Sequence, residues 1–72
     1  MRAHVNMLLS YEDVIVRTMD MELEAIAIVH VGTLMHLAGV SVPFVVERRE
    51  VFYTEAGNVH CVNFYGHKVT RE

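Results

Sequence analysis

Histidine and cysteine are the residue types that could do chemistry in this chain, which has five histidines and one cysteine among 72 residues. His60, Cys61 and His67 offer three potential metal ligands within one short stretch. If this stretch is a strand, His60 and Cys61 point to opposite faces, and residue parity leaves only Cys61 on the same face as His67. Two ligands do not complete a structural zinc site, so we expect no metal there.

The remaining candidates for chemistry are weaker. His30 and His36 lie about 120° apart around a helix axis, whereas zinc-binding helices favour histidines four residues apart. Cys61 would need a nearby base and an electropositive setting to act as a nucleophile, and the sequence indicates neither. We therefore expect no cofactor and no enzymatic activity. A minimal enzyme that uses His60 or His67 as a general base stays as the second alternative, because imidazole titrates near neutral pH.

Binding chemistry has a better candidate in the charge cluster at residues 47–50, which places two arginines between two glutamates. Arginine and aromatic side chains are enriched at the energetic centres of protein interfaces. The alternative is a solvated stretch of strand whose charges compensate one another. The predicted partner-binding residues are Arg48, Arg49, Phe52 and Tyr53 on the strand that contains this cluster, and Tyr65 and His67 on the strand that follows.

The elements that position these residues depend on one uncharged segment. From Ala25 to Val46 the chain has no Asp, Glu, Lys or Arg, which is long enough for a membrane helix. However, the segment contains His30 and His36, and its period changes at Gly39, which suits a helix C-terminus with Pro43 shortly beyond. We therefore expect a buried helix followed by a strand, and no membrane span.

The N-terminal half is predicted to contain one strand and one or two helices. Residues 2–7 alternate polar and apolar side chains, as in a half-buried strand. Ser10 followed by acidic residues favours a helix over 11–19, although the β-branched residues there weaken it. Residues 21–38 are apolar around most of a helical circumference, and this second helix either continues the first or begins anew at Asp20.

The C-terminal half is predicted to be a β-hairpin, with strands at 42–54 and 59–69 and a turn at 55–58. The expected fold class is therefore α+β in the order β-α-β-β, with one long or split helix packed on a small antiparallel sheet. Residues 1–72 form a single small domain.

A chain this short buries a limited fraction of its surface, yet 53% of its residues are hydrophobic. We therefore expect a homodimer that is joined through one side of the 21–38 helix, at Ile28, Val31 and Met35. The leading functional hypothesis is a non-enzymatic protein-binding module that regulates or inhibits a larger complex, as phage-encoded and other mobile-element inhibitors often do. One cysteine and no signal-peptide pattern favour the cytoplasm.

The alternative function is DNA-binding transcriptional regulation. The order of an N-terminal strand, Ser10 and two helical segments resembles that of ribbon-helix-helix proteins, in which paired strands read the major groove. This resemblance implies that Arg2, His4 and Asn6 would face the bases. The net charge of −3 opposes it, so we expect nucleic acid not to be the partner.

Overall fold

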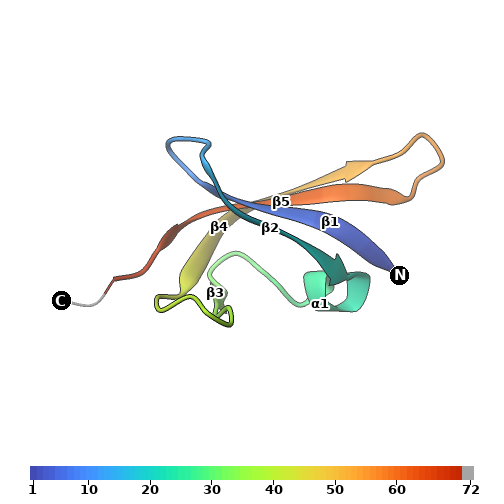
Figure 1. Cartoon of the computed structure of the whole chain (residues 1–72). Helices are drawn as coiled ribbons and strands as arrows, with labels where there is room; N and C mark the ends of the chain where they lie inside the picture. Colours follow the sequence, from blue (N-terminus) through green and yellow to red (C-terminus); the bar gives the residue numbers. More distant parts are fainter. Residues whose placement is uncertain (71–72) are drawn as a thin grey trace.

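A computed structural model describes residues 1–70 of the chain as one curled sheet with a single short helix (Figure 1). The sheet contains five strands, and the helix leads from the second strand into the segment that crosses the sheet. The elements are β1 (Arg2–Leu9), β2 (Ile15–Glu22), α1 (Leu23–Ala27), β3 (Leu34–Met35), β4 (Phe44–Tyr53) and β5 (Val59–Lys68).

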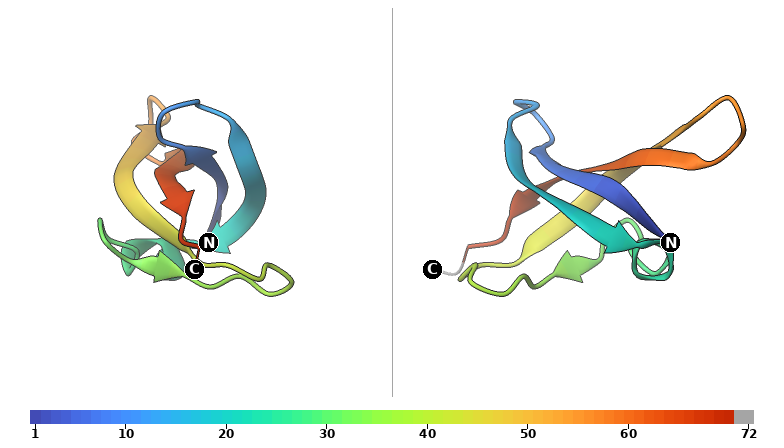
Figure 2. Two further views of the ribbon diagram at one scale, coloured as in Figure 1. Left: turned by 90° about the vertical axis from the view of Figure 1, so that its left-hand side faces the viewer. Right: turned by 45° about the vertical axis from the view of Figure 1, so that its right-hand side comes forward.

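The strands lie side by side in the order β2-β1-β5-β4-β3. β1 and β5 are parallel and central, while the remaining pairs are antiparallel. The hairpins β1–β2 and β4–β5 are therefore joined into one mixed sheet through the first strand of the former, β1, and the second strand of the latter, β5. The views in Figure 2 show that this sheet curls, so that it has a hollow side and an outer side.

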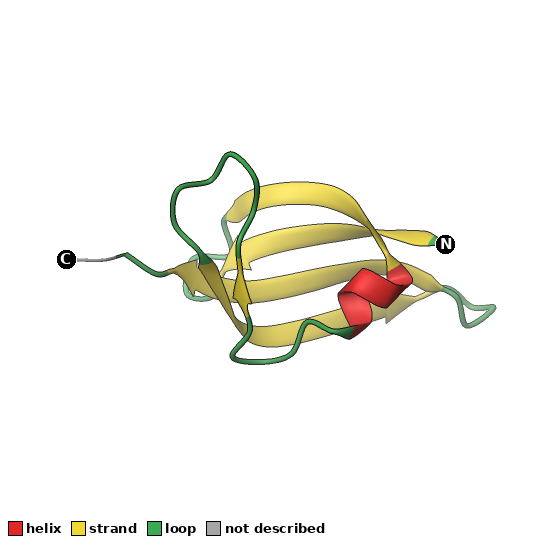
Figure 3. Cartoon of the chain, turned by 90° about the horizontal axis from the view of Figure 1, so that it is seen from below, coloured by secondary structure: helices red, strands yellow, loops and turns green. Residues whose placement is uncertain are grey.

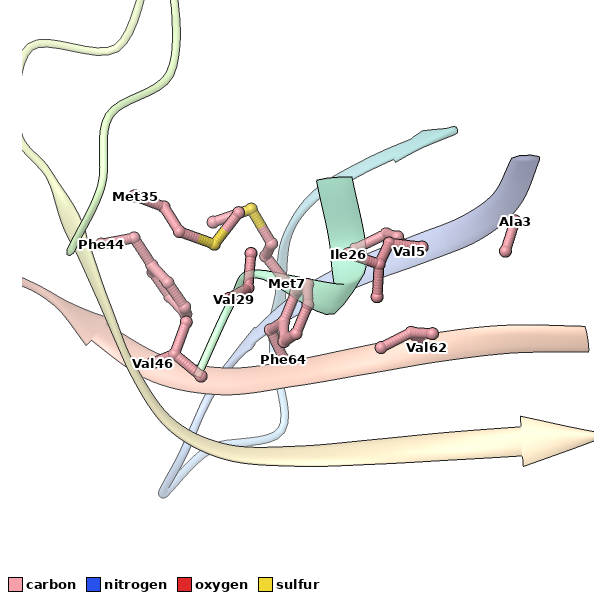
Figure 4. Close-up of a cluster of buried hydrophobic side chains, with 10 residues drawn as sticks. All are labelled: Ala3, Val5, Met7, Ile26, Val29, Met35, Phe44, Val46, Val62 and Phe64. Carbon is pink, nitrogen blue, oxygen red and sulfur yellow. The ribbon is translucent and has the colours of Figure 1, made fainter. Parts of the chain in front are cut away.

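The hydrophobic core fills the hollow side of the sheet. Inward-pointing residues of β1, β4 and β5 meet there, and α1 and the segment leading to β3 lie across them (Figure 3). Figure 4 shows the ten buried side chains of this core: Ala3, Val5, Met7, Ile26, Val29, Met35, Phe44, Val46, Val62 and Phe64.

The helix predicted over 11–19 is wrong. The chain turns after β1, with Asp13 at φ 53°, and returns as β2 against β1. Val14, Ile15 and Val16 are β-branched and favour extended backbone. In addition, Met19 and Met21 pack against the core while Asp20 between them is exposed, which is the period of a strand.

The long helix predicted over 21–38 is also wrong, because only Leu23–Ala27 is helical. Beyond α1 the chain carries several β-branched residues and then Gly32 at φ 94°, a conformation that does not continue a helix. Val29 and Met35 enter the core, while Ile28 and Val31 are exposed. The segment after α1 is therefore irregular and forms a cover over the hydrophobic core. No helix in residues 1–70 is long and apolar enough to cross a membrane.

The expected α+β fold class is accordingly replaced by a mostly β architecture with a mixed sheet. The strands predicted at 2–7, 42–54 and 59–69 are present with small changes at their ends. The turn predicted at 55–58 is present as well, with Gly57 at φ 87°.

An extra residue and a close approach of the backbones shape the β4–β5 hairpin. The pairing steps from Val46–Gly66 to Arg48–Tyr65, which leaves Glu47 as an extra residue in β4. Gly66 is buried, and a Cβ atom there would collide with the backbone carbonyl oxygen of Val45. Only glycine allows β4 and β5 to approach this closely.

Candidate functional site

The outer face of the sheet carries most of the polar chemistry of the molecule. Register places side chains of β1, β5 and β4 in rows across this face. One row joins His4, Cys61 and Phe52, and the next joins Asn6, Asn63 and Glu50. A third row joins Leu8, Tyr65 and Arg48.

Hydrogen bonds connect the middle of this outer face. Asn6 Nδ2 donates to Asn63 Oδ1 at 3.0 Å, and Asn63 Nδ2 donates to the Tyr65 hydroxyl at 3.4 Å. The Arg48 guanidinium lies 4.0 Å from the centre of the Tyr65 ring, a cation–π arrangement. Tyr65 is only 8% exposed, so the arginine covers an aromatic ring that would otherwise face solvent. The network holds Arg48 at a defined place on β4.

A second cluster lies where the extra residue Glu47 projects from β4. Ser10 Oγ donates to Glu47 Oε1 at 2.6 Å, and His67 Nδ1 lies 3.4 Å from the same oxygen. The hydrogen bond from Ser10, followed by that from His67, lowers the pKa of the Glu47 carboxyl below its usual value. The cluster joins the end of β1 to β4 and β5.

This serine, glutamate and histidine do not form a nucleophilic triad. In such a triad the imidazole accepts the proton of the nucleophile and the carboxylate orients the imidazole. Here the carboxylate lies between the other two groups, and the Ser10 hydroxyl donates to it. The arrangement therefore joins three chain segments at one point and does not place the His67 imidazole against the Ser10 hydroxyl.

The six predicted partner-binding residues lie on both faces of the sheet. Arg48, Phe52, Tyr65 and His67 share the outer face, as the rows above and the contact with Glu47 show. Arg49 and Tyr53 point to the other side and border a hollow of about 230 Å³ between β4 and α1. The six residues predicted from the sequence therefore cannot all contact the same flat surface of one partner.

Arg49 also has an internal role. Its Nη1 donates to the backbone carbonyl oxygen of Val29 at 2.8 Å, which ties the segment after α1 to β4. Two backbone hydrogen bonds add to this attachment. Gly32 N donates to the carbonyl oxygen of Val46, and Val46 N donates to the carbonyl oxygen of Thr33. Arg49 thus holds the cover of the core in place.

The predicted self-association residues are divided as well. Ile28 and Val31 are 73% and 69% exposed, but Met35 is 8% exposed and belongs to the core. They do not share a helix face, because the chain is not helical at any of the three positions. Leu34, which the prediction omitted, is 49% exposed on the same uncharged segment.

Within residues 1–70, no three His, Cys, Asp or Glu side chains are placed so that they could hold a metal ion. Cys61 and His67 do share the outer face of β5, as parity indicated. They are six residues apart along the strand, and His67 faces Glu47. At about 3.3 Å per residue along a strand, this separation places the two potential ligands too far apart to share one ion.

Sequence reasoning did not predict the contacts that Asn6, Asn63, Ser10 and Glu47 make in the structure. A signal for Asn6 exists in the alternation of β1, which places it on the outer face. The contacts that join these residues across strands span long stretches of the chain, for example 57 positions between Asn6 and Asn63. Nothing in the local pattern indicates such pairs.

Comparisons of the chain with protein-family models, with curated protein sequences and with solved structures find no match.

Proposed function

We propose that this chain is a non-enzymatic protein-binding module that associates with a second copy of itself and regulates a larger protein complex in the cytoplasm. The observation that carries the proposal is the exposure of large aliphatic side chains along the uncharged segment Ala25–Val46. Ile28, Val31 and Leu34 are all exposed there, while the other side of the same segment enters the core.

Self-association suits this surface because it carries no formal charge. Aliphatic side chains that face water gain about 25 cal/mol for each Å² they bury in a contact. An isologous contact uses the same residues twice, so each exposed side chain contributes to the dimer from both protomers. The strand-helix-helix order that favoured a DNA-binding regulator is absent from the fold, which leaves that alternative without its structural basis.

The outer face supports the second half of the proposal, which is recognition of a different protein. Arg48 and Phe52 project from the same face of β4, one on each side of the row that contains Glu50, and Phe52 is 44% exposed. Arginine and aromatic side chains held in place by neighbours are typical of the energetic centre of an interface. Arg48, Phe52 and His67 are the residues that this proposal assigns to the partner.

Sedimentation equilibrium at micromolar concentration tests self-association. The wild-type chain is expected to form a dimer, and Val31→Asp is expected to shift it toward monomer while the circular dichroism spectrum is unchanged. Val14→Asp is the matched control, because Val14 is also exposed, at 51%, but lies outside the uncharged segment. A wild-type monomer, or equal effects of the two substitutions, would contradict the proposal.

A further inference from the structure

The hollow side of the sheet contains an apolar pocket whose lining includes two cations. The pocket has a volume of about 120 Å³ and lies between the start of β2 and the loop that precedes β4. Met7, Val16, Val40 and Phe44 provide apolar walls, while Arg17 of β2 and Lys68 of β5 also line it. Arg17 reaches this side because it pairs with the buried Met7 and has the same parity in β2 as Met19 and Met21, which pack against the core.

Arg17 and Lys68 differ from the other arginines among residues 1–70, whose side chains contact other groups of the protein. Arg2 donates to the carbonyl oxygen of Asp20, Arg48 covers the ring of Tyr65, and Arg49 donates to Val29. Among residues 1–70, Arg17 and Lys68 have no hydrogen bond to a side chain or ion pair with a carboxylate, and both line the same pocket. No acidic residue lines it.

The size of the pocket limits its occupant. Pockets for small-molecule ligands are usually about 300 to 1,000 Å³, and an apolar cavity of about 150 Å³ holds a molecule the size of benzene. A volume of about 120 Å³ therefore accepts one aliphatic or aromatic side chain and is too small for a long acyl chain.

We infer that this pocket binds the C-terminal residue of a partner protein, with its apolar side chain between Val16 and Phe44 and its carboxylate between Arg17 and Lys68. A terminal residue fits because it carries an apolar side chain and a carboxylate on the same Cα, and the cations belong to the lining of the same small pocket. The inference rests on the proposed protein-binding function in one respect, because it assumes that the occupant of the pocket is part of a protein.

The first test uses N-acetyl-leucine as the probe and N-acetyl-leucinamide, which has the same side chain without the charge, as its control. Two-dimensional NMR of the ¹⁵N-labelled chain is expected to show saturable shifts at the amides of Arg17, Val40 and Lys68. A fragment of this size should bind with a dissociation constant on the order of millimolar. Equal binding of the leucinamide, or shifts confined to other residues, would overturn the inference.

Two further probes separate the possible sources of the ligand. Decanoate presents a carboxylate on a long acyl chain, and capped Leu-Asp amide presents an internal carboxylate. Tighter binding of decanoate than of N-acetyl-leucine would indicate a lipid ligand. Tighter binding of the Leu-Asp amide would indicate an internal acidic segment. Either result would overturn the assignment to a protein C-terminus.

Charge variants complete the experiment. Arg17→Gln and Lys68→Gln are each expected to weaken N-acetyl-leucine binding about fivefold, as for a solvent-accessible ion pair, and Arg17→Lys is expected to retain most of the affinity. Arg2→Gln, on the other face of the sheet, should leave it unchanged. An equal loss in Arg2→Gln would overturn the inference. The variants leave the self-association surface intact, so sedimentation tests the dimer separately.

Discussion

At the scale of single residues, the polar side chains of this protein act mainly between segments that are distant in sequence. Glu47 is the clearest case, because its carboxylate accepts a hydrogen bond from Ser10 and faces His67. Arg49 joins β4 to the segment after α1 in the same manner. Substitutions at these positions therefore report on tertiary contacts rather than on local structure.

The Glu47 cluster predicts a dependence of stability on pH. The pKa of Glu47 is lower in the folded chain than its usual value, so its ionised form stabilises the fold. This contribution is fully present above the unfolded pKa and is lost as the pH falls through the folded pKa. Glu47→Gln should lower the melting temperature at neutral pH and make it less sensitive to acid.

Melting curves between about pH 3 and 7 measure this effect, since carboxylates titrate in that range. Glu50→Gln is the control, because Glu50 lies on the outer face of the same strand and its side chain makes no hydrogen bond or ion pair within residues 1–70. An identical pH profile in the two variants would show that the Ser10–Glu47–His67 cluster does not stabilise the fold.

Arg49→Met is expected to lower the free energy of unfolding by about 1 kcal/mol, because it removes a hydrogen bond to Val29 while keeping an apolar stem. Hydrogen exchange at residues 28–33 should accelerate in this variant. Arg48→Met is the comparison: it should leave exchange at 28–33 unchanged and weaken binding of the partner. Faster exchange in both variants would contradict the separate roles of the two arginines.

At the scale of elements, the approach of two strands and the burial of one side chain decide how the sheet and the segment that covers its core fit together. The approach of β4 to β5 depends on Gly66, and the cover depends on the burial of Met35 beside the exposed Leu34. A substitution of Gly66 tests the first feature, with Gly39 as the control. A substitution of Met35 tests the second, with Leu34 as the control.

Gly66→Ala should destabilise the protein by about 3 kcal/mol, the upper part of the usual range for overpacking, because the new methyl group meets the Val45 backbone. Gly39→Ala is expected to cost less, about 1 to 2 kcal/mol, since Gly39 has a positive φ but open space around it. Denaturant unfolding measures both values. A smaller loss for Gly66→Ala than for Gly39→Ala would contradict the register at Val46–Gly66.

Met35→Ala should cost about 2 to 5 kcal/mol, as for other large side chains removed from a core. Leu34→Ala, at the adjacent residue of β3, should cost less than about 1 kcal/mol, because its side chain is half exposed. Urea unfolding of the two variants provides the measurement. Equal costs would show that the uncharged segment does not pack with Met35 inward.

At the scale of the whole molecule, the sheet order predicts where the structure resists opening. β1 and β5 are paired on both sides, whereas the outer side of β2 has no neighbouring strand within residues 1–70. Native-state hydrogen exchange should therefore be slowest in β1 and β5 and faster in β2. Strong protection throughout 21–38 would instead indicate a long helix and contradict the fold.

The sequence by itself determined the strands with a clean local pattern. β1 alternates, and the β4–β5 hairpin has a turn with Gly57 between two runs of strand-forming residues. It also indicated that the uncharged segment is partly buried, and that Arg48, Phe52, Tyr65 and His67 lie on one strand pair. These features depend on side-chain period and turn chemistry, which act between near neighbours.

Only the tertiary structure decided the rest. β2 has acidic residues after Ser10 that suit a helix start, but pairing with β1 and burial of Met19 and Met21 favour a strand. The uncharged segment has helical spacing, but the curled sheet needs an irregular cover of its hollow side. The bulge at Glu47 shifts the alternation of β4, so that Arg48 and not Arg49 lies on the outer face, and the parallel pairing of β1 with β5 brings Asn6 to Asn63. These outcomes depend on contacts between residues far apart in the chain, whose energies no local pattern records.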